Sequence, residues 1–234
     1  IWPAMLLAYG DLNLPTNVPA NQYILIKGEK ASASRGVGKN LNDYLDEWNP
    51  DSLRYALASI LPEQNDSEIS EDEMIRRNNE ELVAAWGNLV QRVFSQYINN
   101  FENLEFDFEL NDVDKKIIDE GNDCFKKTGE LIEKVELKSS LQSVMGYVNK
   151  INAYLNETEP WKVIKEDSSR ATAILHTSLT AIEACASLFT PFMPTTSEIV
   201  KGAIEKNTNN NWSVNDIKKG APLQDIGHLF KKFD

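Results

Sequence analysis

The sequence predicts a mainly α-helical protein, in which a helical bundle follows a short mixed segment. Three observations support this fold class. From residue 69 onward, apolar residues recur every three or four positions in several separate segments, as in amphipathic helices. After residue 110 no segment alternates apolar and polar residues in the way that a half-buried strand does. Before residue 69, the short apolar run 23–26 is interpreted as a buried strand.

Residues 1–68 form the first predicted unit. The apolar run is followed by a loop of small residues at 30–38. A helix begins at Asp51 and ends before Pro62, because a proline disfavours helical geometry in the residue that precedes it. The acidic and polar stretch 63–68 then separates this unit from the rest of the chain.

Residues 69–234 form the second predicted unit, with about five helices. Ser70 and Glu73 have the spacing of a capping box, which predicts a helix from there to about Asn100. Asn111 is a suitable N-cap for the next helix. Such helices pack their apolar stripes into one shared core. From first to last, the stripes contain Leu82, Trp86, Leu89, Val93 and Tyr97; Val113, Ile117 and Ile118; Leu141, Val144, Met145, Val148, Ile151 and Leu155; Ile174, Leu175, Leu179, Ile182 and Phe189; and Ile199, Val200 and Ile204.

Composition and charge exclude several classes of protein. Of the 234 residues, 41% are hydrophobic and 26% charged, which suits a globular domain and not a disordered chain. The net charge is −12, so a broad basic surface that grips nucleic acid through its phosphates is excluded. Any RNA binding must therefore depend on a few placed groups. No apolar run approaches the roughly 20 residues that span a bilayer, so we expect no membrane association.

The cysteine and histidine residues predict no metal site. The two cysteines, Cys124 and Cys185, are far apart in sequence and form no C-x-x-C pair. Neither histidine has the neighbours that a zinc site requires. We interpret the cysteines as idle thiols in a reducing cytosol.

Six short segments along the chain have the form of known sequence motifs. They are Ile24–Ser34, similar to a strand and a K-M-S-K-S loop; Asp51–Tyr55, similar to D-x-L-R-Y; Asn88–Arg92; Asn152–Trp161, similar to N-x-Y…P-W; Thr190–Pro194, similar to P-F-M-P; and Leu229–Phe233, similar to L-F-x-K-I. Each segment alone is weakly specific, but together they cover essentially the whole chain. In this order they resemble the C-terminal portion of methionyl-tRNA synthetase, a class I aminoacyl-tRNA synthetase, in which Asn88–Arg92 corresponds to the start of the anticodon-binding domain.

The resemblance implies a fold and a function. Residues 1–68 would be a remnant of the α/β, Rossmann-like catalytic domain, and residues 69–234 a helical anticodon-binding domain. The longer parent would be a cytoplasmic, monomeric enzyme that uses ATP to attach methionine to the tRNA with anticodon C-A-U. The family's H-I-G-H signature, methionine pocket and zinc-binding insert are absent, so this chain alone is expected to be inactive. A non-catalytic RNA-binding module and a sister synthetase for leucine, valine, isoleucine or cysteine remain alternatives.

The ATP loop departs from the family pattern. It reads Lys30, Ala31, Ser32, Ala33 and Ser34, with alanine in place of the usual methionine and second lysine. In the family that lysine stabilises charge on the ATP phosphates, and an alanine side chain supplies no such interaction. A natural divergence, an engineered replacement and a copy that no longer catalyses all explain the change. In this chain the loop's lysine and serines could equally be ordinary surface residues.

By the same resemblance, Asn88, Arg92 and Trp161 would bind the anticodon. Asn88 and Arg92 are four residues apart, so they share one face of a helix beside its apolar stripe. Amide and guanidinium groups can hydrogen-bond the edges of an unstacked base, and a tryptophan ring can stack on it. The alternatives are two solvated polar residues and a core tryptophan. Asp51 and Arg54 are interpreted as an internal helix pair.

Overall fold

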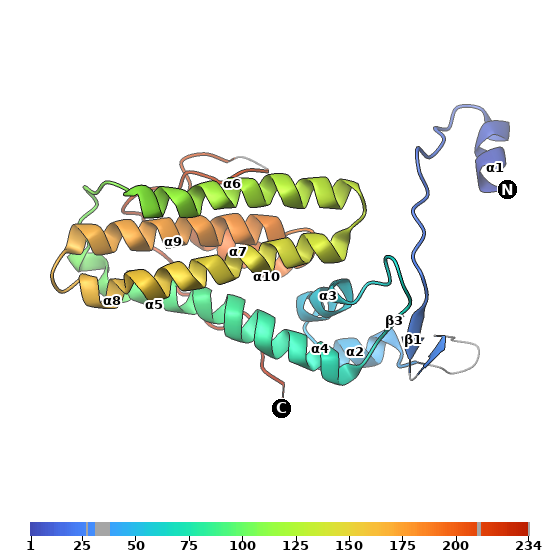
Figure 1. Cartoon of the computed structure of the whole chain (residues 1–234), viewed down its shortest axis with the longest axis horizontal. Helices are drawn as coiled ribbons and strands as arrows, with labels where there is room; N and C mark the ends of the chain where they lie inside the picture. The colour runs from blue at the N-terminus through green and yellow to red at the C-terminus, as the bar shows by residue number, and fades with distance from the viewer. Residues whose placement is uncertain (27, 31–37, 210–211, 234) are drawn as a thin grey trace.

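The computed structural model describes residues 1–26, 28–30, 38–209 and 212–233. Helices dominate, and a small sheet lies at one end of the molecule (Figure 1). The elements are α1 (Trp2–Tyr9), β1 (Ile24–Ile26), β2 (Glu29–Lys30), α2 (Leu41–Glu47), α3 (Pro50–Ser59), β3 (Ser67–Glu68), α4 (Glu71–Arg77), the π-helix η2 (Asn78–Gly87), α5 (Asn88–Asn100), the short 3₁₀ helix η3 (Phe101–Asn103), α6 (Asp112–Glu133), α7 (Leu137–Thr158), α8 (Pro160–Val163), α9 (Ser168–Phe189) and α10 (Pro194–Ala203).

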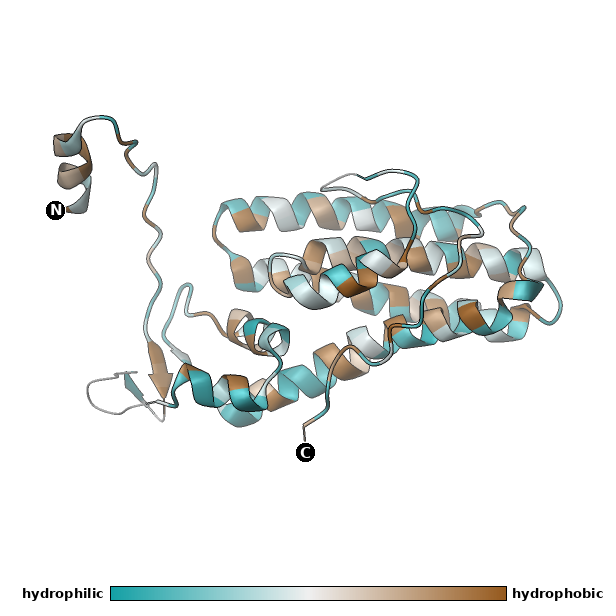
Figure 2. Cartoon of the chain, turned by 180° about the vertical axis from the view of Figure 1, so that it is seen from behind, coloured by the Kyte–Doolittle hydropathy of each residue, from teal (hydrophilic) through white to brown (hydrophobic). Residues whose placement is uncertain are grey.

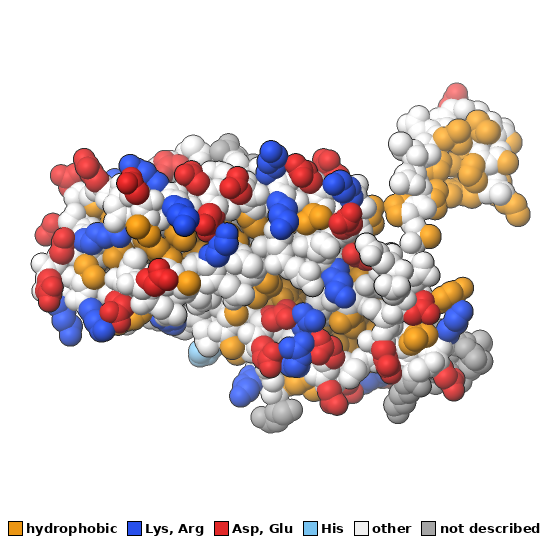
Figure 3. Space-filling view, viewed as in Figure 1, with side chains coloured by type: hydrophobic (Ala, Val, Ile, Leu, Met, Phe, Trp, Pro, Cys, Tyr) orange, Lys and Arg blue, Asp and Glu red, His pale blue; other side chains and the backbone are white. Residues whose placement is uncertain are grey.

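The predicted strand is the centre of a three-stranded sheet with the order β2-β1-β3. It pairs antiparallel with β2, where Leu25 faces Lys30, and parallel with β3, where Leu25 faces Glu68. The segment before β1 extends away from the body and carries α1, whose apolar side chains are exposed (Figures 1 and 3). This mixed part and the bundle that follows it confirm the predicted fold class.

The helix predicted from Ser70 to about Asn100 is one rod made of α4, η2 and α5. Ser70 is its N-cap residue, but its side chain makes no cap hydrogen bond, so the predicted capping box is wrong. The rod passes through a π-helical stretch at η2, where each turn is wider than in an α-helix. Its apolar stripe, which includes Leu82 and Val93, lies in the core as predicted.

Helix α9 is the centre of the bundle, and α6, α7, α8, α5 and α10 pack around it (Figure 1). Every residue from Ala171 to Phe189 is buried. Apolar and polar residues are mixed along the helices of the bundle (Figure 2). Its length and composition would suffice to cross a membrane, but here it is enclosed on all sides by the other helices. Asn111 caps α6 in a capping box with Asp114, as the sequence suggested for this N-cap.

Polar contacts hold α3 to the far end of α9. Asp51 accepts hydrogen bonds from the backbone N and hydroxyl of Thr196, at 2.6 and 2.9 Å, at the start of α10. Arg54 donates to the carbonyl oxygens of Pro191 and Phe192, each at 2.9 Å. The two residues therefore bind the turn between α9 and α10 and do not pair with each other, so their interpretation as an internal pair is wrong. The sequence alone could not show that this turn lies beside α3, because the turn is more than 130 residues farther along the chain.

Candidate functional site

Arg92 lies on the flank of α5, beside the stripe that enters the core. Leu89 and Val93 on that stripe are buried, whereas Arg92 is half-buried. Its Nη2 donates a hydrogen bond to Oδ1 of Asn156, at 2.9 Å, in the last turns of α7. This contact crosses from one helix to the next and fixes the direction of the guanidinium group.

A tight turn between α7 and α8 brings Trp161 to the same place. Glu159 ends α7 with a left-handed backbone, at φ 41°, and buried Pro160 begins α8. The chain therefore reverses just before Trp161, which packs partly buried against the bundle core. The guanidinium carbon Cζ of Arg92 lies 5.4 Å from the centroid of the Trp161 ring, within the range of a cation–π contact.

These side chains border a cavity of about 360 Å³ between α5 and the α7–α8 turn. Its lining combines one cation, one indole ring and several uncharged hydrogen-bonding groups, which suits a flat, uncharged ring with polar edges. For a phosphate it offers only one cationic side chain, that of Arg92. The lining residues are Gln91, Arg92, Ser95, Gln96, Leu155 and Trp161.

The structure thus brings two of the three predicted anticodon residues together. Asn88 is exposed at the start of α5, one turn before Arg92, and no hydrogen bond joins it to Arg92 or Trp161 among the residues described. Asn156 was missed by the sequence reasoning. It lies four residues after Asn152 of the N-x-Y segment, on the same face of α7, and this spacing could have suggested it.

A buried ion pair supports the end of the bundle that carries Trp161. Asp114 of α6 is fully buried and accepts hydrogen bonds from Arg170 of α9, at 2.5 and 2.9 Å, and from the hydroxyl of Tyr154 of α7, at 2.5 Å. Burial disfavours the charged carboxylate, but the hydrogen bonds from Arg170 and Tyr154 outweigh it, so the pKa of Asp114 lies below its ordinary value. These contacts join α6, α7 and α9 near the α7–α8 turn.

The predicted ATP loop is described only at its first residue. Lys30 lies in β2, with its Nζ 3.5 Å from the centroid of the Tyr23 ring. Ala31, Ser32, Ala33 and Ser34 lie outside the described residues.

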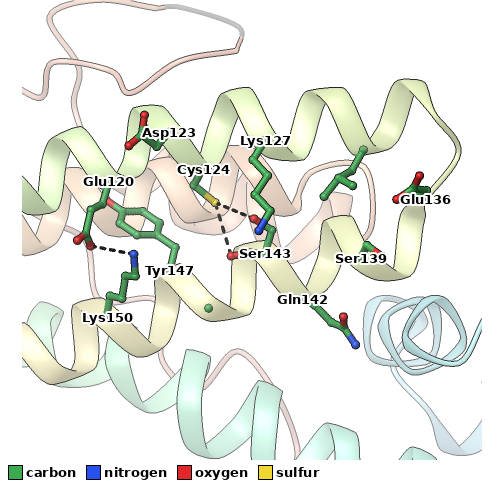
Figure 4. A pocket seen from close by; sticks show the side chains of 12 residues that line it. Glu120, Asp123, Cys124, Lys127, Glu136, Ser139, Gln142, Ser143, Tyr147 and Lys150 are labelled. Atoms are coloured by element: carbon green, nitrogen blue, oxygen red, sulfur yellow. Dashed lines mark hydrogen bonds and ion pairs between the residues drawn. The ribbon is translucent and has the colours of Figure 1, made fainter.

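A second cavity, about 480 Å³, is a groove between α6 and α7 (Figure 4). Glu120 and Lys150 pair across it at 3.4 Å, and the Cys124 thiol donates to the carbonyl oxygen of Ser143 at 3.7 Å. Burial raises the pKa of that thiol, so it is a poor nucleophile at neutral pH. Both cysteines are buried, and no cluster of His, Cys, Asp or Glu that could hold a metal occurs in the part of the chain that the structure describes.

Comparison with known proteins decides the family. Residues 1–94 match the model of class I tRNA synthetases of the methionine type, and residues 107–234 match the model of the anticodon-binding domain of methionyl-tRNA ligase. The chain belongs to the methionyl-tRNA synthetase family. The resemblance carried by the six short segments is thereby confirmed, and the reading as a sister synthetase is not supported.

Similar proteins agree with this family. The methionine–tRNA ligase of Chloroflexus aggregans is 38% identical over 214 residues, which are 85% of this chain and 36% of the relative. That of Roseiflexus castenholzii is 38% identical over 263 residues, covering 100% of this chain and 44% of the relative. The apo Mycobacterium tuberculosis methionyl-tRNA synthetase has the same fold, with a TM-score of 0.82 at 20% identity over 100% of this chain and 47% of that one. The chain therefore spans between about a third and a half of the length of these relatives.

Proposed function

We propose that this chain selects methionine tRNA through the anticodon C-A-U, as part of a longer enzyme that uses ATP to attach methionine to that tRNA. The family assignment supports the reaction, and a related synthetase from M. tuberculosis has been solved with methionyl-adenylate bound. The observation that carries the proposal is the convergence of Arg92 and Trp161 on one cavity, from helices that are far apart in sequence.

The charge of the chain restricts how it can select an RNA. With a net charge of −12, the surface repels a phosphate backbone at long range. Acidic and basic side chains alternate over the visible face of the bundle and form no basic stripe there (Figure 3). Recognition must therefore come from stacking and from hydrogen bonds to base edges.

The cavity offers both. In the proposed complex the first anticodon base stacks on the Trp161 ring, and the Arg92 guanidinium donates to the base's carbonyl oxygen and ring nitrogen. Asn88, one helical turn away, completes the contacts with its amide. In the free protein the guanidinium lies over the ring, so Arg92 must move aside when the base enters.

Binding of anticodon stem–loop RNAs tests the proposal. Arg92→Ala and Trp161→Ala should each weaken binding of the C-A-U stem–loop by roughly 1–3 kcal/mol, a factor of about 5 to 150. Binding of a stem–loop with a changed first base should be much less affected. Trp212→Ala is the matched control, because Trp212 is 39% exposed but lies against Phe125 and not at this cavity. Equal, small losses for both RNAs, with an intact circular dichroism spectrum, would contradict the proposal.

A further inference from the structure

Besides Arg92, three polar side chains line the cavity beside Trp161. Gln91, Ser95 and Gln96 line it together with Arg92 and Trp161. We propose that Gln96 reads the adenine at the second position of the anticodon. This inference rests on the proposed function of the cavity and adds a residue, and a base, to it.

The first argument is the spacing of side chains along α5. Asn88, Arg92 and Gln96 follow one another at intervals of four residues, so they form one row along the helix. Each interval corresponds to a rise of about 6 Å. Stacked nucleotides rise by about 3.4 Å along a strand, and bases that are splayed out for recognition lie farther apart. One turn of α5 is therefore on the scale of one step between unstacked bases.

The second argument is that the Gln96 amide is available for an RNA. Gln96 is half-buried at the edge of the cavity, and its side chain forms no hydrogen bond with any residue that the structure describes. Gln91, its neighbour in the cavity, differs because its Nε2 donates to the Ser95 hydroxyl at 3.2 Å. Of the two glutamines, Gln96 is the one with its full hydrogen-bonding capacity unused.

The third argument is chemical. A glutamine amide carries a carbonyl acceptor beside an NH₂ donor, and adenine presents the complementary pair on one edge: the N6 amino group and the N7 acceptor. Guanine offers two acceptors on the same edge, so it leaves the glutamine carbonyl unpaired. Of the two purines, adenine is therefore the one that a glutamine pairs with fully on this edge, as the second base of C-A-U requires.

The test compares Gln96→Met with the parent chain. Methionine has nearly the same length and helix propensity as glutamine but cannot form the paired hydrogen bonds. We expect binding of the C-A-U stem–loop to weaken by roughly 5- to 150-fold. Binding of a C-G-U stem–loop, which is weaker at the outset, should change by less than about twofold. Asn99→Met is the matched control, since Asn99 is an exposed amide on α5 that does not line the cavity.

Each result has one meaning. Equal effects of Gln96→Met on the two RNAs, or no effect on either, overturn the assignment of Gln96 to the second base. Arg92→Ala, measured against first-base changes in parallel, separates this failure from that of the proposed function. If Arg92→Ala discriminates between first bases and Gln96→Met does not discriminate between second bases, only the role of Gln96 is wrong. If neither variant discriminates, both proposals fall.

Discussion

The buried imidazole of His176 should make this fold sensitive to mild acid. His176 lies in α9, is only 8% exposed, and its ring centroid is 5.1 Å from that of Phe108. Burial, together with the positive charge of nearby Lys219, lowers the pKa of His176 from 6.5 to about 4 against the opposing effect of Asp216. The folded protein therefore keeps the imidazole neutral at a pH where the unfolded chain would bind a proton.

The sign and size of the effect follow from proton linkage. Between pH 6.5 and 4 the unfolded state binds more protons at this residue, so the free energy of unfolding decreases as the pH falls. From pH 6.5 to pH 5 the change is 1.5 pH units, and at 1.36 kcal/mol per unit the loss is about 2 kcal/mol. The hydrogen bonds of Glu73 with Arg76 and Arg77 outweigh its desolvation and lower its pKa from 4.5 to about 2. Its contribution to the free energy of unfolding is therefore lost mainly below pH 4.5, outside the range from pH 6.5 to pH 5.

Urea unfolding at pH 7 and pH 5, followed by far-ultraviolet circular dichroism, measures this loss. In His176→Gln the side chain cannot titrate. We expect this variant to be less stable than the parent at pH 7. Its free energy of unfolding should, however, decrease by about 2 kcal/mol less than that of the parent between pH 7 and pH 5. His228→Gln is the matched control, because His228 is the second histidine of the sequence and is exposed. If parent and His176→Gln lose the same stability between the two pH values, the acid sensitivity has another origin and the reasoning is wrong.

Two further predictions concern single contacts. Asn156→Ala removes the hydrogen bond that holds Arg92 over Trp161, which is worth about 1 kcal/mol, so stopped-flow tryptophan fluorescence should show a few-fold faster association with the C-A-U stem–loop. Binding ten times weaker would instead show that Asn156 contacts the RNA. Asp51→Ala leaves the start of α10 without its buried acceptor for Thr196, and urea unfolding should show a loss of about 2 kcal/mol. An unchanged unfolding midpoint would mean that solvent replaces this contact without cost.

The sequence predicted the helices well because their signal is local. A helix that buries one face repeats apolar residues every three or four positions, and the stripes through Trp86, Val148 and Ile182 all lie in the core. The strands β2 and β3 could not be predicted, since two residues are too few to show alternation and their pairing with β1 is a tertiary contact. The π-helical stretch in the rod has no local signal of its own.

The candidate site shows a different limit. Helical spacing places Arg92 beside the buried stripe of α5, and the resemblance supplies its role. Its contact with Trp161, 69 residues later, depends on how α5 crosses α7 and on the left-handed backbone of Glu159 that reverses the chain. Neither is encoded by a local pattern. The contact of Asn156 with Arg92 across the helix pair likewise appears only in three dimensions, although the four-residue spacing from Asn152 indicates the face of α7 on which Asn156 lies.

The acidic surface has a consequence for specificity. A basic domain binds any RNA through its phosphates, and this sequence-independent attraction competes with selection of the right one. A chain with net charge −12 lacks that attraction, so it should bind an RNA that does not fit the cavity only with low affinity. Nearly all of the affinity must then come from contacts with base edges and ring faces, and the loss of one such contact is not offset by the backbone. The acidic net charge of the chain therefore does not weaken the proposed anticodon recognition by Arg92, Trp161 and Gln96. It makes the binding free energy depend on which bases contact these three residues.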